Sequence, residues 1–306
     1  MSLLVVGTTA LDSIKTPWAE NPRLLGGSAS HAAVAASFFT RPHLIGAVGD
    51  DFPRKYINLY RRHGINLEGL HQLPGQTFHW SGEYEVNMNN RRTLDTVLGV
   101  IEDFSPTLST AHTRLPYVLL ANCAPDLQSN VLEQMKRPKF IVADTMDLWL
   151  NIARAPLLKL LKCIDCLVLN DSEAAQLVEE DNVIGAIPRI HKLGPKYVIV
   201  KKGEHGSILS SPKGLFIAPA YPLKKVVDPT GAGDSFVGGV IGYLASQKGS
   251  VGKNLRAAII HGTATASFCC EGFGLRKTSS CCSKIRKAIR KDIAQRVREL
   301  IKLTQW

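Results

Sequence analysis

The most regular feature of the sequence is a series of short apolar runs rich in Val, Ile and Leu. Six runs of this kind occur, over Leu3–Gly7, His43–Val48, Tyr117–Ala121, Phe140–Ala143, Cys166–Leu169 and Tyr197–Val200. Continuous apolar strands bounded by turn residues are typical of a parallel sheet buried on both faces. The apolar spacing between the runs predicts helices over Ser28–Phe39, Pro53–His63, Asp126–Lys136, Ser172–Glu179 and Asp234–Gln247. This alternation of strands and helices predicts a layered α/β fold.

One region departs from this alternation. Residues Gln76–Val100 alternate aromatic or β-branched residues with polar ones and contain Asn89-Asn90, a plausible turn. We interpret the region as strands of a small sheet that projects from the main body as a lid, joined by the segment after the first strand, residues 10–20. No Gly/Ser-rich or Pro-rich linker divides the chain, which favours one domain over residues 1–306.

The charge of the chain is concentrated at its end. The 306 residues carry a formal net charge of +11, of which +8 falls on Arg276–Trp306 and only +3 on the rest. In this tail Ile285, Ile289, Ile293, Val297 and Leu300 form one apolar helical face among basic residues. A terminal helix that packs on the domain is the leading interpretation, with binding to a membrane surface or a nucleic acid as the alternative.

Composition restricts the class of protein. With 45% hydrophobic residues the chain can bury a sizeable core, which excludes wholesale disorder. No apolar run approaches the length of a membrane span, and the N-terminus lacks the basic region of a secretory signal. Seven cysteines are an odd number, which favours reduced thiols. We therefore expect a cytoplasmic protein with neither a membrane span nor a nucleic-acid partner.

The segment Val226–Gly239 (VVDPTGAGDSFVGG) carries the clearest chemical signal. Its small residues let successive backbone N–H groups converge at the start of a helix, an arrangement that binds phosphate or a developing oxyanion. Asp234 would stand beside these amides, where a carboxylate can accept a proton from a hydroxyl. From composition alone, a glycine-rich turn in which Asp234 merely caps the helix explains the segment equally well.

The string Asp228–Phe236 (DPTGAGDSF) resembles the C-terminal signature of the ribokinase-like (PfkB) carbohydrate kinases. Further resemblances follow the order of that family, in Gly26–Ala33 (GGSASHAA), Gly46–Asp51 (GAVGDD), Asn170–Glu173 (NDSE) and Lys201–Gly206 (KKGEHG). The resemblance covers nearly the whole chain. It implies a ribokinase-like three-layer α/β/α fold with a mainly parallel central sheet and a small β-sheet lid. It also implies ATP-dependent phosphorylation of a hydroxyl on a small sugar or sugar-like substrate.

The resemblance also implies roles for single residues. Asp234 would be the general base, with the amides of Gly231, Ala232 and Gly233 as anion hole. Asn170 and Glu173 would organise Mg²⁺ through waters. The ATP site would include Asn170, Lys201, Gly203, Gly206, His261 and Gly272. Asp228 and Thr230 fall where some relatives bind a monovalent cation, so K⁺ is a further candidate cofactor.

The acceptor site is implied less completely. Candidate contacts with the substrate are Asp12, Gly26, Gly27, Ser28, His31, Asn122 and Arg92. His31 stands where the family usually has Asn, and Asn122 where ribokinase has a carboxylate, which argues against simple ribose.

Three alternatives for the function stay open. Trp80 and Tyr84 in the lid would suit a nucleoside kinase, and an arginine in the lid would suit an acceptor that is already phosphorylated. A silent regulator that binds a sugar or nucleotide is the third. A homodimer through the lid is also compatible with the resemblance.

Overall fold

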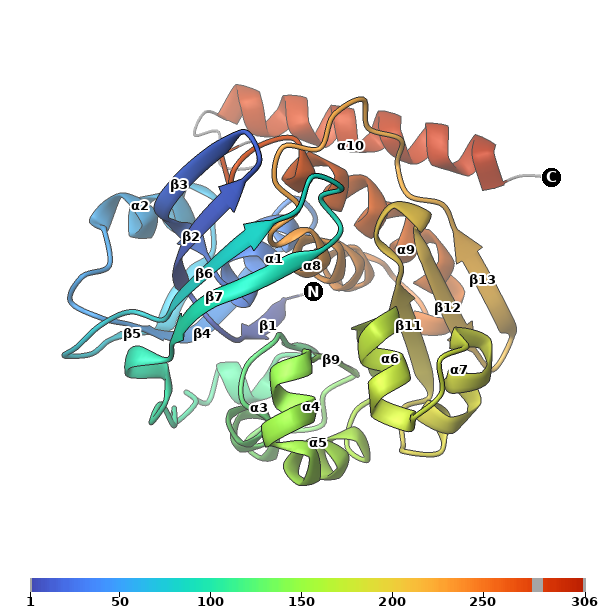
Figure 1. Ribbon diagram of the computed structural model, residues 1–306. Helices are drawn as coiled ribbons and strands as arrows, with labels where there is room; N and C mark the ends of the chain where they lie inside the picture. The colour runs from blue at the N-terminus through green and yellow to red at the C-terminus, as the bar shows by residue number, and fades with distance from the viewer. Residues whose placement is uncertain (1, 277–282, 305–306) are drawn as a thin grey trace.

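A nine-stranded sheet forms the centre of the protein in a computed structural model, which describes residues 2–276 and 283–304 (Figure 1). Its strands lie in the order β13-β12-β11-β10-β9-β8-β1-β4-β5. Their bounds are β1 Leu3–Val6, β4 Pro42–Val48, β5 Asn66–Gln72, β8 Tyr117–Leu120, β9 Phe140–Asp144, β10 Cys166–Asn170, β11 Tyr197–Lys201, β12 Ser207–Ser211 and β13 Gly214–Ala218. All neighbours from β5 to β11 pair in parallel, while β12 and β13 are antiparallel. The six predicted strands and the mainly parallel sheet are confirmed.

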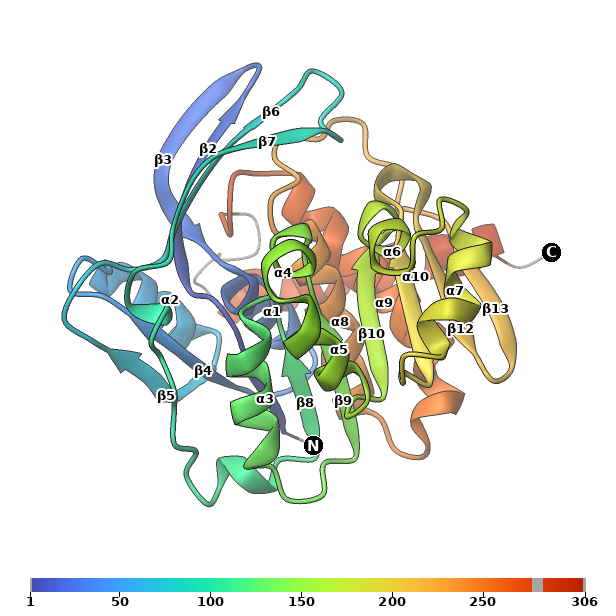
Figure 2. The ribbon, with the colours of Figure 1, turned by 60° about the horizontal axis from the view of Figure 1, so that its bottom comes forward.

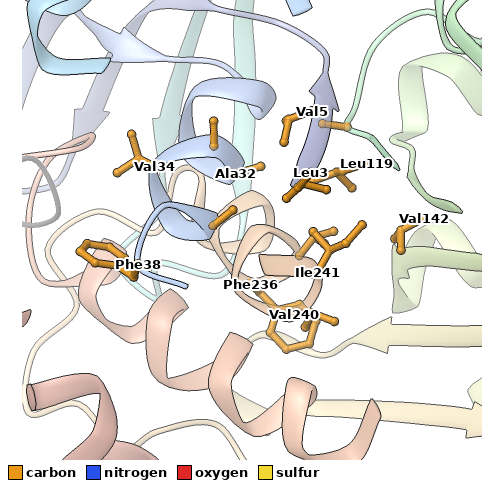
Figure 3. Packing of buried hydrophobic residues seen from close by; sticks show 14 of the residues in the cluster. Leu3, Val5, Ala32, Val34, Phe38, Leu119, Val142, Phe236, Val240 and Ile241 are labelled. Carbon is orange, nitrogen blue, oxygen red and sulfur yellow. The ribbon is translucent and has the colours of Figure 1, made fainter. Parts of the chain in front are cut away.

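Helices cover both faces of this sheet because its strands are apolar on both sides. Leu3 and Val5 of β1 face one core together with α1 (Ser28–Ala36) and α8 (Ala232–Ser246), as Figure 3 shows, whereas Leu4 and Val6 face the opposite core. Successive side chains of a strand point to opposite faces, so a continuous apolar run supplies both cores. This arrangement is the expected three-layer α/β/α fold.

Each face has its own set of helices. The first also carries α2 (Arg54–Arg62), α9 (Val251–Cys270) and α10 (Ser283–Thr304). The second carries α3 (Pro125–Glu133), α4 (Asp147–Ile152), α5 (Arg154–Leu161), α6 (Asp171–Val178) and α7 (Val183–His191). All five predicted helices are present, and their ends differ from the predicted ones by at most three residues.

A separate four-stranded sheet, called the small sheet below, projects from the body of the protein (Figure 2). Its order is β3-β2-β6-β7, with β2 Ala10–Thr16, β3 Ala19–Gly26, β6 His79–Tyr84 and β7 Arg91–Val97. Glu85 and Asn90 close the loop between β6 and β7 through a backbone hydrogen bond of 3.1 Å, so the turn predicted at Asn89-Asn90 is confirmed. Ile14, Tyr84 and Met88 pack with Val226 and Phe273, which attaches this sheet to the segments that flank α8 and α9.

The basic tail folds into α10, whose apolar face is buried against the rest of the domain. Ile289, Ile293, Val297 and Leu300 are each less than a tenth exposed. Arg296 lies 3.7 Å above the ring of Phe268 and forms an ion pair with Glu271 at 2.8 Å. Packing therefore accounts for the apolar spacing of the tail, while Ile285 of that pattern lies outside the residues whose side chains are described. Across residues 2–276 and 283–304, none of the helices has the length and apolar character needed to cross a membrane.

We predict that Leu300→Ala lowers the free energy of unfolding by about 2–5 kcal/mol, because it removes a fully buried side chain and leaves a cavity. Leu303→Ala on the same helix is the matched control, since that side chain is 53% exposed and its loss should change stability by less than about 0.5 kcal/mol. Urea denaturation of both variants measures the difference. Equal stabilities would show that α10 does not contribute to the core.

Candidate active site

Polar side chains gather where four neighbouring parallel strands end. Asp144, Asn170 and Lys201 are the last residues of β9, β10 and β11, and Asn122 follows β8 by two residues. The carboxyl ends of parallel strands lie on one edge of a sheet, and the crevice outside that edge is where such folds bind ligands. The strand order thus brings together residues that are far apart in the sequence.

The start of α8 supplies backbone donors beside this edge. Gly231 adopts the left-handed conformation with φ of +76°, and a Cβ there would overlap the ring of His31, so only glycine fits. Of the three predicted anion-hole amides, the Ala232 N–H already donates to Pro229 O at 3.0 Å. Amides in the first turn of a helix have no acceptor within the helix and are free to bind an anion.

Asp234 is part of a cluster of charges at this helix start. Lys201 Nζ lies 3.0 and 3.1 Å from the two carboxylate oxygens of Asp144. Burial raises the pKa of Asp234, and the positive charges of Lys201 and Arg91 act against this rise. Burial disfavours the ammonium of Lys201, but the negative charges of Asp144, Glu173 and Asp234 outweigh it and raise its pKa. A carboxylate whose pKa is raised toward neutrality is a stronger base than an ordinary one.

Asn170 and Glu173 hold each other at the start of α6. The Asn170 side chain accepts the Glu173 N–H at 2.7 Å, and Glu173 Oε2 accepts the Asn170 N–H at 2.7 Å, which is a capping box. Burial raises the pKa of Glu173 to about 7, and the positive charge of Lys201 is the main influence that lowers it. In the described part of the chain, no three His, Cys, Asp or Glu side chains are arranged to hold a metal ion. The oxygen donors of this pair fit Mg²⁺ that retains its waters rather than a closed protein cage.

Five of the residues predicted to bind the acceptor lie together around Asp12 of β2. Gly27 N donates to Asp12 Oδ2 at 3.3 Å, a Cβ on Gly26 would overlap that oxygen, and Ser28 Oγ donates to Asn122 O at 2.7 Å. Asp12 Oδ1 is buried without a hydrogen-bond partner, and burial raises the pKa of Asp12 to about 7. An unpaired buried carboxyl oxygen is costly, so it fits a site whose ligand supplies a hydroxyl.

The side chain of Asn122 already has protein partners, whereas the ring of His31 has one unpaired nitrogen. Asn122 Oδ1 accepts from Trp149 Nε1 at 2.9 Å, and its amide contacts Met146 Sδ at 2.9 Å. His31 is 1% exposed, packs under Gly231 and has its pKa lowered to about 4 by burial, so the ring is neutral. Its Nε2 is buried without a partner, and its ring packs against Gly231 at the start of α8.

The two neighbouring arginines of β7 have different surroundings. Arg92 forms an ion pair with Glu83 at 2.8 Å and its side chain is 74% exposed, so the structure does not bring it to Asp12. The charge of Arg91, rather than that of the predicted Arg92, acts on Asp234 and Glu173. Asp144 was missed, although a polar residue at the end of a buried strand was a signal that could have revealed it.

Most of the remaining predicted residues lie in the turn after β11 or in the loop before α8. Gly203 and Gly206 form the turn after β11, and Asn89 of the small sheet reaches this turn through a 3.0 Å hydrogen bond to Glu204. Both oxygens of Asp228 accept backbone N–H groups, from Thr230 at 2.9 Å and Gly274 at 3.0 Å.

His261 lies away from these two segments, and Gly272 lies at a third place. The ring of His261 stacks on Tyr243, eleven residues into α8, so it lies about 16 Å along the helix from the anion hole. Gly272 follows the end of α9, beside the residues that contact Asp228.

Comparison with known proteins agrees with this geometry. Residues 21–280 match the family described as pfkB family carbohydrate kinase. Cytidine kinase from Thermococcus kodakarensis is 25% identical over 252 residues, which cover 79% of this chain and 88% of that protein. Nucleoside kinase from Methanocaldococcus jannaschii is 23% identical over 303 residues, covering 94% and 96% of the two chains.

Solved structures share the fold at lower identity. A Burkholderia thailandensis nucleoside kinase in complex with inosine has a TM-score of 0.77 at 18% identity, covering 97% of this chain and 96% of that one. Arabidopsis thaliana ribokinase complexed with ribose and ATP has a TM-score of 0.75 at 20% identity, covering 97% and 98%. These likenesses confirm the ribokinase fold.

We predict that stability depends on pH through Asp12. Its folded pKa of about 7 lies above its ordinary value of 3.8, so the folded protein holds a proton that the unfolded chain releases. The resulting stability is present below pH 4 and is lost as pH rises through 7. Relative to Asp12→Asn, which cannot ionise, the wild type should therefore lose roughly 2–4 kcal/mol between pH 4 and 8.

Urea denaturation of both proteins at several pH values measures this loss. The exposed Asp181→Asn is the control and should follow the wild type at every pH. A constant difference between wild type and Asp12→Asn would contradict the buried, protonated carboxyl.

Proposed function

The chain belongs to the pfkB family of carbohydrate kinases, and on this premise we propose that it transfers the γ-phosphoryl group of ATP to a hydroxyl of a small sugar or sugar-like acceptor. One observation carries the proposal: Asp234 stands in the first turn of α8 beside the amides of Gly231 and Gly233 and close to the charge of Lys201. A base, an anion hole and a cation at one point are what phosphoryl transfer requires.

Asp234 would act as the general base. Its carboxylate accepts the proton of the acceptor hydroxyl while that oxygen attacks the γ-phosphorus and the bond to the β-phosphate oxygen breaks, releasing ADP. The N–H groups of Gly231 and Gly233 would hold the charge on the phosphoryl oxygens. Asp12, with its unpaired buried oxygen, would bind another hydroxyl of the acceptor and orient it.

Asn170 and Glu173 would hold Mg²⁺ through its waters, and the bound ion would neutralise charge on the ATP phosphates. The turn at Gly203 and Gly206 would border the nucleotide. Potassium activation would rest on Asp228 and Thr230, through lone pairs that the two backbone N–H groups leave unused. We also propose that Asn89, through Glu204, lets the small sheet act as a lid that reaches the nucleotide turn.

A nucleoside acceptor is the second candidate. The relatives that span most of this chain include a cytidine kinase and a nucleoside kinase. Trp80 lies half-buried on β6, where its ring could stack on a base.

We also propose a cellular location and an oligomeric state. A cytoplasmic location would supply ATP and Mg²⁺. The edge strand β7 is exposed along six of its seven residues, which suits a homodimer through the lid.

A coupled assay of ADP release across sugars, sugar phosphates and nucleosides tests the function. We predict turnover with at least one class, and a ~10²–10⁴-fold lower kcat in Asp234→Asn with ATP binding retained, because the base is lost. Asp126→Asn is the matched control, since Asp126 is also an acidic residue in the first turn of a helix but is exposed.

The possible results separate the alternatives. Turnover only with nucleosides would show that the acceptor is a nucleoside and not a sugar. No turnover with any class would favour a binding protein without catalytic activity. Near-normal kcat in Asp234→Asn would remove the base assignment.

A further inference from the structure

The ion pair between Asp144 and Lys201 is the best-defined buried charge contact of the active-site edge. The side chain of Asp144 is 4% exposed and that of Lys201 is 19% exposed. Asp144 is fixed in place, because its Oδ1 accepts the Thr145 N–H at 3.1 Å and its backbone oxygen accepts from Gln128 Nε2 at 3.0 Å. Lys201 is thus held by a carboxylate whose position is supported by two further hydrogen bonds.

Stability is a poor explanation for this pair. Removing two charges from water costs about as much free energy as their attraction returns, so buried ion pairs are weak stabilising devices. The charges of Glu173 and Asp234 also raise the pKa of Lys201, so three acidic side chains act on one ammonium. Such a cluster suits a site that receives a further ligand better than it suits a closed core.

The position of Lys201 points to that ligand. Its Nζ lies 3.3 Å from the place that a Cβ would take on Gly233, so the ammonium stands directly beside the anion-hole backbone. The next residue, Lys202, points elsewhere and contacts the half-exposed Asp171 at 3.3 Å. Of the two adjacent lysines, Lys201 is the one that lies beside the first turn of α8.

We propose that Lys201 binds the transferring γ-phosphoryl group and that Asp144 is the residue that positions it. This inference rests on the proposed kinase activity. As the acceptor oxygen forms its bond to phosphorus and the bond to ADP breaks, Lys201 donates a hydrogen bond to a γ-phosphoryl oxygen and keeps its proton throughout. Asp234 takes the acceptor proton, and Asp144 remains ionised as the partner of Lys201. Preorganised cations of this kind stabilise the charge of the transition state.

Two binding measurements and one rate test the proposal. In Lys201→Met the affinity for the ATP analogue AMP-PNP with Mg²⁺ should fall about tenfold or more, while the affinity for ADP changes less than about twofold, because ADP lacks the γ-phosphate. The kcat should fall by about 10²-fold. Lys201→Arg should recover part of the loss, and the control Lys202→Met should match the wild type.

The double variant Asp144→Asn/Lys201→Met separates a catalytic pair from a structural one. It removes both charges of the Asp144–Lys201 pair, so it should fold even where Asp144→Asn alone, which leaves Lys201 without this partner, does not. Our proposal predicts that it stays as slow as Lys201→Met. Recovery of wild-type kcat in the double variant, or equal loss of ADP and AMP-PNP affinity in Lys201→Met, would overturn it. If the wild type itself phosphorylates no acceptor, the proposed function fails, yet the contrast between AMP-PNP and ADP still decides the role of Lys201.

Discussion

A cluster of three buried acidic side chains around one ammonium, at the carboxyl edge of the sheet, is the constraint on which the rest of the site depends. Asp144, Glu173 and Asp234 act on the single ammonium of Lys201, and burial raises the pKa of each carboxyl group. Charges of like sign at such depth are costly unless a cation joins them. The amides of the α8 start provide the complementary feature, a place for an anion. The combination suits a divalent cation that enters together with a nucleotide phosphate.

The fold produces this constraint from separate parts. The parallel strands β9, β10 and β11 end side by side and deliver Asp144, Asn170 and Lys201 to one edge. The start of α8 adds Asp234, and the small sheet adds Asp12 and the charge of Arg91. Tyr84 receives a hydrogen bond from Thr230 at 3.1 Å, which ties the small sheet to the loop before the anion hole. A change in the position of the small sheet would therefore act on the loop before α8, which contains Thr230.

The sequence predicted the parts of the fold that depend on continuous apolar runs, and it missed those that do not. Strands β5, β12 and β13 lie at or near the sheet edges, where polar residues interrupt the pattern, and so they were not predicted. The cluster around Asp234 was largely foreseen, because its motifs are local. Asp144 belongs to no such motif, and its importance follows only from the pairing of β9 with β10. Arg91 and Arg92 are neighbours on β7, so their side chains point to opposite faces of the small sheet. The sequence does not show which of the two faces is directed toward Asp234.

The dependence of nucleotide affinity on Mg²⁺ tests the central claim most directly. Because three acidic side chains act on the one ammonium of Lys201, that ammonium alone offers the phosphates of a free nucleotide little net positive charge, and a divalent ion that enters with them supplies the rest. Titration calorimetry of the wild type with AMP-PNP, in Mg²⁺ and in EDTA, measures this. The account predicts that affinity falls about tenfold or more when Mg²⁺ is removed. Equal affinity in both buffers would contradict it.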